Sequence, residues 1–219
     1  LNLGCPSGTV VAKKKGSGLL GELDMLEHML DKIYSTTDMK VSIKTRIGKE
    51  SPEEFPEILN IFNRYPVYEL IIHPRVRSDF YKNKPNMERF SWAVKESEHS
   101  LCYNGDVVTV EDFKAIDNRY PSVDSIMIGR GFLQNPMLAN EIKDGAKPDM
   151  EYIKYFHDLV MEGYIEVMSG ERPVLFKMKE LWCYLIKLFP DAERYGKKIR
   201  KAEKLNVYRE VVEELFERS

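Results

Sequence analysis

The amino-acid sequence predicts an α/β protein: an N-terminally incomplete TIM (β/α)8 barrel, contributing about strands 4 to 8, followed by a small all-α domain. Three observations support this prediction. Five short apolar segments alternate with longer amphipathic segments, which is typical of βα units in a parallel sheet. Each apolar segment ends in glycine, amide or basic residues, as at the carboxyl-terminal face of a parallel barrel. The last third of the chain shows only helical patterns.

The elements follow in chain order. The predicted strands span residues 1–3, 40–46, 68–73, 100–103 and 124–128. Apolar residues at helical spacing predict a helix within residues 18–30. Ser51-Pro52-Glu53-Glu54 combines an N-cap residue, a first-turn proline and early acids, so we expect a helix to begin there. Thr109 precedes the next helix.

A change to turn-forming residues near residues 145–149 predicts a domain boundary. We expect the C-terminal portion of a barrel over residues 1–146 and a helical domain over residues 149–219. A closed barrel takes about 250 residues, or about 30 per βα unit, so we expect roughly three units to precede Leu1. The alternative is an open five-stranded α/β sheet that is complete as written.

Composition narrows the function classes. The 219 residues are 43% hydrophobic and 31% charged, with a net charge of −2, which favours a folded protein and excludes a globally basic nucleic-acid binder. The three cysteines, Cys5, Cys102 and Cys183, have no metal-ligand spacing, and their odd number argues against a secreted disulfide framework. We therefore expect a cytoplasmic protein that uses no metal and does not span a membrane.

The candidate catalytic residue is Cys5, which follows the first predicted strand and lies between Gly4 and Pro6. Pro6 donates no backbone hydrogen bond and Gly4 permits a sharp bend, so we expect a turn to present the thiol. Such a thiol can donate a proton to carbon or attack an electrophile. The alternative is a small buried hydrophobic side chain, but the glycine-rich loop at residues 16–18 favours a functional role.

Lys44 and Arg46 are two residues apart on the second predicted strand, so their side chains face the same side. If that side lines the barrel interior, an electron-rich ligand would explain a lysine there. A solvated basic face on an edge strand is the alternative. His73 follows Ile71 and Ile72 at the end of the third predicted strand, where it is either a ligand contact or a satisfied core residue.

Two loops are candidate ligand-binding loops. Asn104-Gly105-Asp106 follows the fourth predicted strand, and these residues would form a hairpin turn if the neighbouring strands were antiparallel. The helix start that follows them favours a βα loop. Gly129-Arg130-Gly131 follows the fifth predicted strand, where backbone amides and a guanidinium can surround a phosphate. These are the positions after strands 7 and 8, where TIM barrels often bind phosphate.

Together these motifs resemble, in order, the tRNA-dihydrouridine synthases. The matching segments are residues 2–6, 10–11, 16–20, 44–48, 73–75, 104–106 and 127–131. The resemblance covers the family's barrel from its fourth strand onward and its C-terminal helical domain; the family's first-strand segment and its third-strand glutamine are not in this sequence. It implies an FMN-dependent oxidoreductase that reduces the 5,6 double bond of particular uridines in tRNA, with NADPH, or more generally NAD(P)H, as reductant.

The resemblance also implies roles for individual residues. Cys5 matches the general acid that protonates carbon 5 of uracil. Lys44 and His73 match residues that contact the flavin ring system. Asn104, Gly105 and Asp106 match the family's loop that holds the ribityl chain. Gly129 and Arg130 match the loop that holds the phosphate. Arg75 matches the family's arginine after the histidine, although Pro74 stands where many members have glycine.

The C-terminal segment from Lys177 to Lys204 holds nine basic and four acidic residues, which is consistent with tRNA binding through phosphates. Trp182, Tyr184 and Tyr195 lie among them and either stack on bases or pack in a core. A solvated helix face is the alternative for the charges. Two rival functions remain open: an FMN-dependent TIM-barrel oxidoreductase of a small pyrimidine or enoate, and a truncated, non-catalytic RNA-binding remnant.

Overall fold

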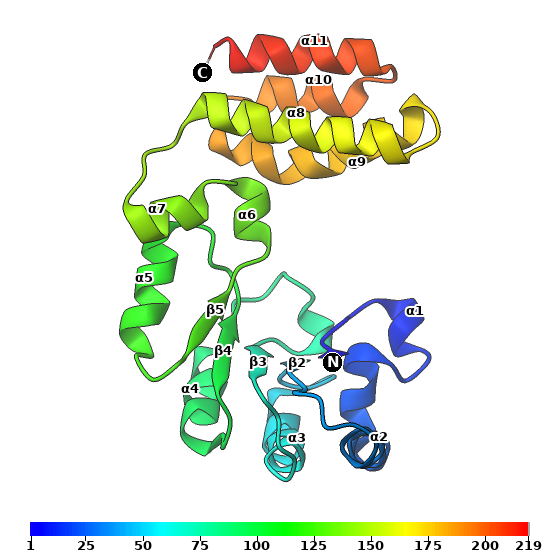
Figure 1. Cartoon of the computed structure of the whole chain (residues 1–219), viewed down its shortest axis with the longest axis vertical. Coiled ribbons are helices and arrows are strands. Elements are labelled where there is room, and N and C mark those ends of the chain that lie inside the picture. Colours follow the sequence, from blue (N-terminus) through cyan, green and yellow to red (C-terminus); the bar gives the residue numbers. More distant parts are fainter. Residues whose placement is uncertain (219) are drawn as a thin grey trace. The chain divides into compact units, whose positions relative to one another are not determined.

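A parallel sheet of five strands, in the order β1-β2-β3-β4-β5, is the framework of the first part of the chain (Figure 1). The computed structural model describes residues 1–218. The strands are β1 (Asn2–Leu3), β2 (Ile43–Arg46), β3 (Leu70–His73), β4 (Leu101–Asn104) and β5 (Ser125–Met127). All five predicted strands are confirmed, and so is the α/β class with a parallel sheet.

The register of the sheet determines which side chains meet where the strands end. Every strand is parallel to its neighbour, so the carboxyl ends of all five lie along one edge. Lys44 on β2 is level with Ile71 on β3, and Arg46 is level with His73. Residues that follow β1 to β4 in the sequence are therefore neighbours in space.

The chain forms two compact units, and each is described by itself. Unit 1 comprises Leu1–Asp106 and Lys114–Met127, and unit 2 comprises Val107–Phe113 and the residues from Ile128 onward. The helices that follow β1 to β4 are α1 (Gly8–Val11), η1 (Gly16–Gly21), α2 (Leu23–Thr36), η2 (Pro52–Glu54), α3 (Phe55–Phe62), η3 (Arg77–Asp79), α4 (Met87–Glu96) and α5 (Val110–Arg119). Leu30, Phe62 and Phe90, on α2, α3 and α4, are fully buried.

Local chemistry explains where these helices begin. The helix start expected at Ser51 is present, and Ser51 and Glu54 form a capping box there, with the Ser51 side chain accepting from the Glu53 amide and the Glu54 carboxylate accepting from the Ser51 amide. Thr109 accepts a hydrogen bond from the Asp112 amide at the start of α5. The α-helix expected within residues 18–30 begins only at Leu23, because residues 16–21 form the 3-10 helix η1.

The helices from residue 130 onward belong to unit 2. They are α6 (Arg130–Gln134), α7 (Leu138–Asp144), α8 (Met150–Val167), α9 (Glu171–Leu185), η4 (Ile186–Leu188), α10 (Glu193–Lys201) and α11 (Leu205–Phe216). Gly145 ends α7 in the left-handed conformation, with a φ of 64°. Helices α8 to α11 lie side by side (Figure 1), and they share one hydrophobic core. Unit 2 takes in α6 and α7, which precede the turn near Gly145; the boundary expected there stays a prediction.

None of the helices in the described part of the chain combines the length and apolar composition that a membrane span requires.

A buried hydrogen-bonded chain crosses the core of unit 2. Trp182 Nε1 donates to Tyr208 Oη at 2.7 Å, and that hydroxyl donates to His157 Nε2 at 2.6 Å. His157 Nδ1 therefore carries the ring proton and donates to Asp158 Oδ1 at 2.8 Å. Trp182, His157 and Tyr208 are all almost fully buried, so each of these polar atoms depends on its neighbour in the chain.

Replacing Tyr208 with phenylalanine removes the central hydroxyl and leaves buried groups of Trp182 and His157 without their partner. We expect Tyr208→Phe to lower the free energy of unfolding by roughly 2 to 6 kcal/mol, at about 1 to 3 kcal/mol for each of the two unsatisfied groups. Tyr155→Phe is the matched control, because Tyr155 is 62% exposed. Urea unfolding of both variants measures the difference in the free energy of unfolding. Equal stability of the two variants would contradict the proposed importance of these buried hydrogen bonds.

Candidate active site at the carboxyl ends of the strands

The loop that carries Cys5 is fixed by its own backbone. The Cys5 carbonyl accepts hydrogen bonds from the Ser17 amide at 3.1 Å and from the Ser17 hydroxyl at 2.7 Å. Gly16 has a φ of 54°, and a Cβ there would lie 2.9 Å from the Cys5 carbonyl oxygen, so glycine is required on steric and conformational grounds. Cys5 itself is half-buried. Cys5 lies in the irregular segment between β1 and α1, where no regular turn is assigned, and the Gly16-Ser17-Gly18 segment packs against it.

Arg46 joins this loop to the loop that follows β3. Its guanidinium is buried and donates to three backbone carbonyls: Nε to Gly4 at 3.0 Å, Nη1 to Val76 at 2.8 Å and Nη2 to Phe80 at 3.0 Å. Because β2 lies between β1 and β3 and Arg46 is 1% exposed, the alternative of a solvated basic face on an edge strand is wrong for Arg46. The spacing of Lys44 and Arg46 in the sequence predicted that the two side chains share one face of the strand. It did not predict the hydrogen bonds that Arg46 makes.

We call the edge of the sheet where β1 to β4 end the mouth; it is formed by Cys5, Lys44, Arg46, His73, Arg75, Asn104, Gly105 and Asp106. Lys44 is half-buried there, and burial followed by the charge of Arg46 lowers its pKa. Burial also lowers the pKa of His73 to about 3, with further contributions from Arg46 and Lys44. His73 is therefore neutral at physiological pH.

Arg75 and Asp106 form a bidentate ion pair at the mouth. Arg75 Nη1 and Nη2 donate to the two carboxylate oxygens of Asp106 at 2.8 and 2.5 Å, and Arg75 Nε donates to the Asn83 carbonyl at 2.5 Å. Nη1 also lies 3.1 Å from His73 Nε2. Asp106 has a φ of 37°, a conformation that a non-glycine residue adopts at a cost. The ion pair with Arg75 fixes Asp106, and with it the loop after β4, in this conformation.

The segment Asn104-Gly105-Asp106 is a βα loop, as expected. Strand β4 is parallel to both β3 and β5, so the hairpin alternative is wrong. The Asn104 side chain donates to the Met127 carbonyl at 2.8 Å and thereby joins the ends of β4 and β5. The structure thus brings six of the predicted site residues together at the mouth. They are Cys5, Lys44, His73, Asn104, Gly105 and Asp106.

Sequence reasoning missed Tyr81. Its ring centroid is 6.0 Å from that of His73, and the Arg46 guanidinium lies 5.7 Å from the Tyr81 ring. Tyr81 is 53% exposed, so one part of this aromatic ring faces solvent at the mouth. The long, polar segment that follows β3 was the available signal, although its residue types alone do not indicate where its side chains lie.

Gly129 and Arg130 belong to unit 2, whereas the residues of the mouth belong to unit 1. Gly129 is exposed and precedes α6, and Arg130 is its first residue. Gly131 has a packing role, because a Cβ there would overlap the Val107 carbonyl oxygen and contact Ile128. Phosphate binding by Gly129 and Arg130 stays a prediction.

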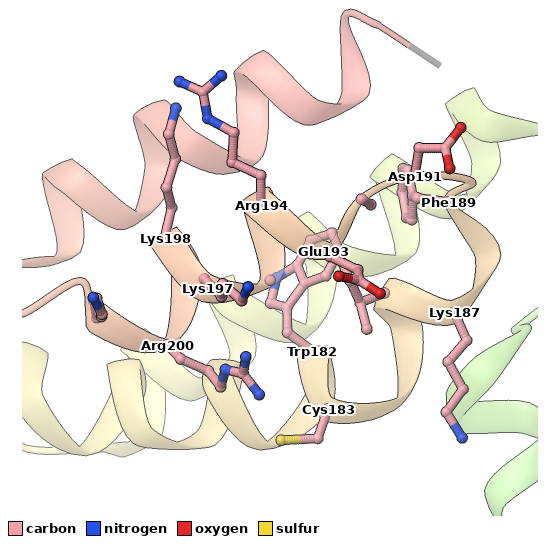
Figure 2. A pocket seen from close by; sticks show the side chains of 14 residues that line it. Trp182, Cys183, Lys187, Phe189, Asp191, Glu193, Arg194, Lys197, Lys198 and Arg200 are labelled. Carbon is pink, nitrogen blue, oxygen red and sulfur yellow. The ribbon is translucent and has the colours of Figure 1, made fainter.

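Unit 2 contains a cavity of about 1050 Å³ between the end of α9, η4 and α10 (Figure 2). Basic side chains line it, and we call them the basic basin: Lys187, Arg194, Lys197, Lys198, Arg200 and Lys201. Figure 2 shows Lys187 and Arg200 extending from two sides of the cavity. Trp182 and Tyr195 are 3% and 5% exposed, so these two aromatic residues pack in the core and are not available for stacking on a base.

The mouth combines a half-buried thiol with several cationic or neutral donors. This arrangement can bind an electron-rich planar ligand and give it a proton from Cys5. Cys5, Cys102 and Cys183 are all unpaired thiols. Over residues 1–218, no three His, Cys, Asp or Glu side chains are grouped so that they could hold a metal ion.

The lowered pKa of His73 predicts a pH dependence of stability. An unfolded histidine titrates near pH 6.5 whereas folded His73 titrates near 3, so only the unfolded state gains this proton between those values. The free energy of unfolding should therefore fall on acidification. Between pH 7 and 5 we expect it to fall by roughly 2 kcal/mol more than in His73→Gln, at about 1.4 kcal/mol per pH unit. Parallel pH profiles of the two proteins would contradict this.

Comparison with known proteins identifies the family. The model of the dihydrouridine synthase family matches residues 1–219. A probable tRNA-dihydrouridine synthase of Helicobacter pylori is 30% identical over 98% of this chain and 65% of its own length. The tRNA-dihydrouridine synthase B of Pasteurella multocida is 31% identical over 63% of this chain and 42% of its own. The tRNA-dihydrouridine(16) synthase of Vibrio parahaemolyticus is 27% identical over 93% and 64%.

This chain spans 65% of the length of the Helicobacter relative. The family match nevertheless extends over every residue of the chain, and it agrees with the resemblance read from the motifs at the mouth. The protein belongs to the dihydrouridine synthase family.

Proposed function

We propose that the whole protein reduces particular uridines of tRNA to 5,6-dihydrouridine, with FMN as cofactor and NADPH as reductant. The observation that carries this proposal is the grouping of Cys5, Lys44 and His73 at the mouth of a chain that belongs to the dihydrouridine synthase family. Several relatives are named for this reaction on tRNA. Since tRNA is the proposed substrate, we assign the activity to the cytoplasm.

The donor set at the mouth fits a flavin. Lys44, Arg46 and Arg75 bring three positive charges to it, and Asp106 offsets one of them. The remaining repulsion between these cations is one reason that the pKa of Lys44 is lowered. An electron-rich heterocycle bound at the mouth would relieve this repulsion. Lys44 and His73 would contact the ring system, Asn104, Gly105 and Asp106 would hold the ribityl chain, and Gly129 and Arg130 would bind the phosphate.

Cys5 supplies the proton in this mechanism. When bound and reduced by NADPH, FMN would supply the hydride that carbon 6 of uracil receives. The Cys5 thiol donates its proton to carbon 5, and the hydrogen bonds from Ser17 and Arg46 to the adjacent carbonyls keep the thiol at the mouth. The target uridine must leave its stack to reach this position.

The sheet fits the later strands of a TIM barrel. Five parallel strands in sequential order are what strands 4 to 8 of such a barrel would provide. We assign residues 1–146 to the C-terminal portion of this FMN-binding barrel and residues 149–219 to a helical tRNA-binding domain. The consistently helical structure described after Gly145 supports this assignment.

The basic basin is the proposed contact with the tRNA backbone. Its six basic residues exceed the two acids of the same cavity, Asp191 and Glu193. Lys198 is already paired with Glu214 at 3.0 Å, so the exposed Lys197, Arg200 and Lys201 are better placed for phosphates. Such a surface favours a large polyanion over a small pyrimidine or enoate as substrate.

Replacing Cys5 with alanine tests the general acid. In the whole protein, we expect Cys5→Ala to leave FMN binding and NADPH oxidation by the flavin largely intact, and to reduce dihydrouridine formation by about 100-fold or more. Rates are measured in single turnovers of the reduced enzyme with tRNA. Unchanged tRNA reduction would remove Cys5 from the mechanism.

Neutralising part of the basic basin tests the tRNA contact. The basin variant carries glutamine in place of Lys197, Arg200 and Lys201. The control variant carries glutamine in place of three exposed lysines of unit 1, which are Lys32, Lys95 and Lys114. We expect the basin variant to bind tRNA more weakly, and the slope of log affinity against log salt to fall by about 0.7 to 0.9 per lost contact. NADPH oxidation should not change in either variant. If both triple variants bind tRNA alike, the basin is only a solvated face.

A further inference from the structure

Arg75 makes a contact with His73 that restricts the histidine's proton. A guanidinium has only donors, and it remains protonated at every pH that a folded protein tolerates. Arg75 Nη1 has two hydrogens: one is directed to Asp106 Oδ1 at 2.8 Å, and the other is available to His73 Nε2 at 3.1 Å. His73 Nε2 must therefore accept, which requires its lone pair.

A neutral imidazole has one protonated nitrogen, so the proton of His73 lies on Nδ1. The alternative tautomer would direct an Nε2–H at the guanidinium, donor against donor. Arg75 cannot turn away to avoid this, because Asp106 and the Asn83 carbonyl hold it from the other side. Arg75 is 2% exposed, so water does not compete for these bonds.

The charges around His73 reinforce the neutral form. Lys44 and Arg46 act on it from β2, Arg75 acts from the loop after β3, and Asp106 is the acidic group that opposes them. The Tyr81 ring lies against the imidazole from the loop after η3. Three cations against one carboxylate disfavour a second proton on the ring.

We infer that Arg75, anchored by Asp106, is a positioning residue that keeps His73 as the neutral tautomer protonated at Nδ1. The relevance to flavin rests on the proposed function: Nδ1–H is the donor that His73 can offer to an electron-rich ring. The other tautomer would present a lone pair from Nδ1 and repel the same atoms. Arg75 thus sets the polarity of the His73 contact without touching the ligand.

Nuclear magnetic resonance of the ring nitrogens reads the tautomer directly. The chain is labelled with ¹⁵N-histidine, and long-range proton–nitrogen spectra distinguish Nδ1–H from Nε2–H in each of its four histidines. His73→Gln assigns the His73 signals. The spectra are recorded without flavin between pH 7 and 5, where His73 should show Nδ1–H and should not titrate.

Three variants test the role of Arg75. Arg75→Gln introduces an amide that can donate or accept, so both tautomers should appear and the pKa of His73 should rise with the loss of a cation. Arg75→Lys keeps a donor-only cation and should preserve Nδ1–H. Arg77→Gln is the matched control, because it removes the same charge two residues away, where Arg77 pairs with Glu50 at 3.4 Å; it should leave His73 unchanged.

An Nε2–H signal for His73 in the unmodified protein would overturn the inference even if a variant fails to fold. So would an unchanged tautomer in folded Arg75→Gln, or the same change in Arg77→Gln. FMN binding by the whole protein is measured separately by flavin fluorescence. If FMN does not bind while His73 shows the expected tautomer, the proposed function fails and the role of Arg75 stands.

Discussion

The buried guanidinium of Arg46 is the constraint on which the candidate site depends. A buried cation is costly unless hydrogen bonds satisfy it, and Arg46 gains them from the carbonyls of Gly4, Val76 and Phe80. These carbonyls belong to loops that follow two different strands. A single charged group on β2 therefore fixes both loops, and with them the half-buried thiol of Cys5.

A second buried guanidinium, that of Arg75, joins two loops at the same edge of the sheet. Arg75 ties the loop after β3 to Asp106 in the loop after β4, so consecutive strand ends are joined by buried guanidinium groups. Burial first, and then the positive charges of Arg46, Lys44 and Arg75, lower the pKa of His73 to about 3, and burial followed by the charge of Arg46 also lowers the pKa of Lys44. Fixed donors of this kind stabilise charge without reorganising during a reaction. The donors at the mouth are therefore held in place by the protein's own groups.

Local sequence patterns predicted the five strands and the residues at their ends, because apolar runs followed by Gly, Asn or a basic residue are local signals. They could not predict the bonds of Arg46, whose partners lie 30 to 42 residues away in the sequence. The packing of Gly16 against Cys5 and the burial of Trp182 likewise depend on tertiary contacts. Residue types indicated which groups carry the chemistry, and the fold determined what holds them.

Hydrogen–deuterium exchange of Arg46→Lys tests the constraint most directly. A lysine keeps the charge, but its single ammonium cannot reproduce the planar fork of Nε, Nη1 and Nη2 with which Arg46 reaches carbonyls of two loops. The amides of Gly4, Cys5 and Ser7 and those of residues 76–80, far apart in the sequence, should exchange faster together, while α8 to α11 keep their protection. Arg119→Lys, a change at the exposed end of α5, is the control. Unchanged exchange in both segments, or faster exchange throughout the chain, would contradict the central role assigned to Arg46.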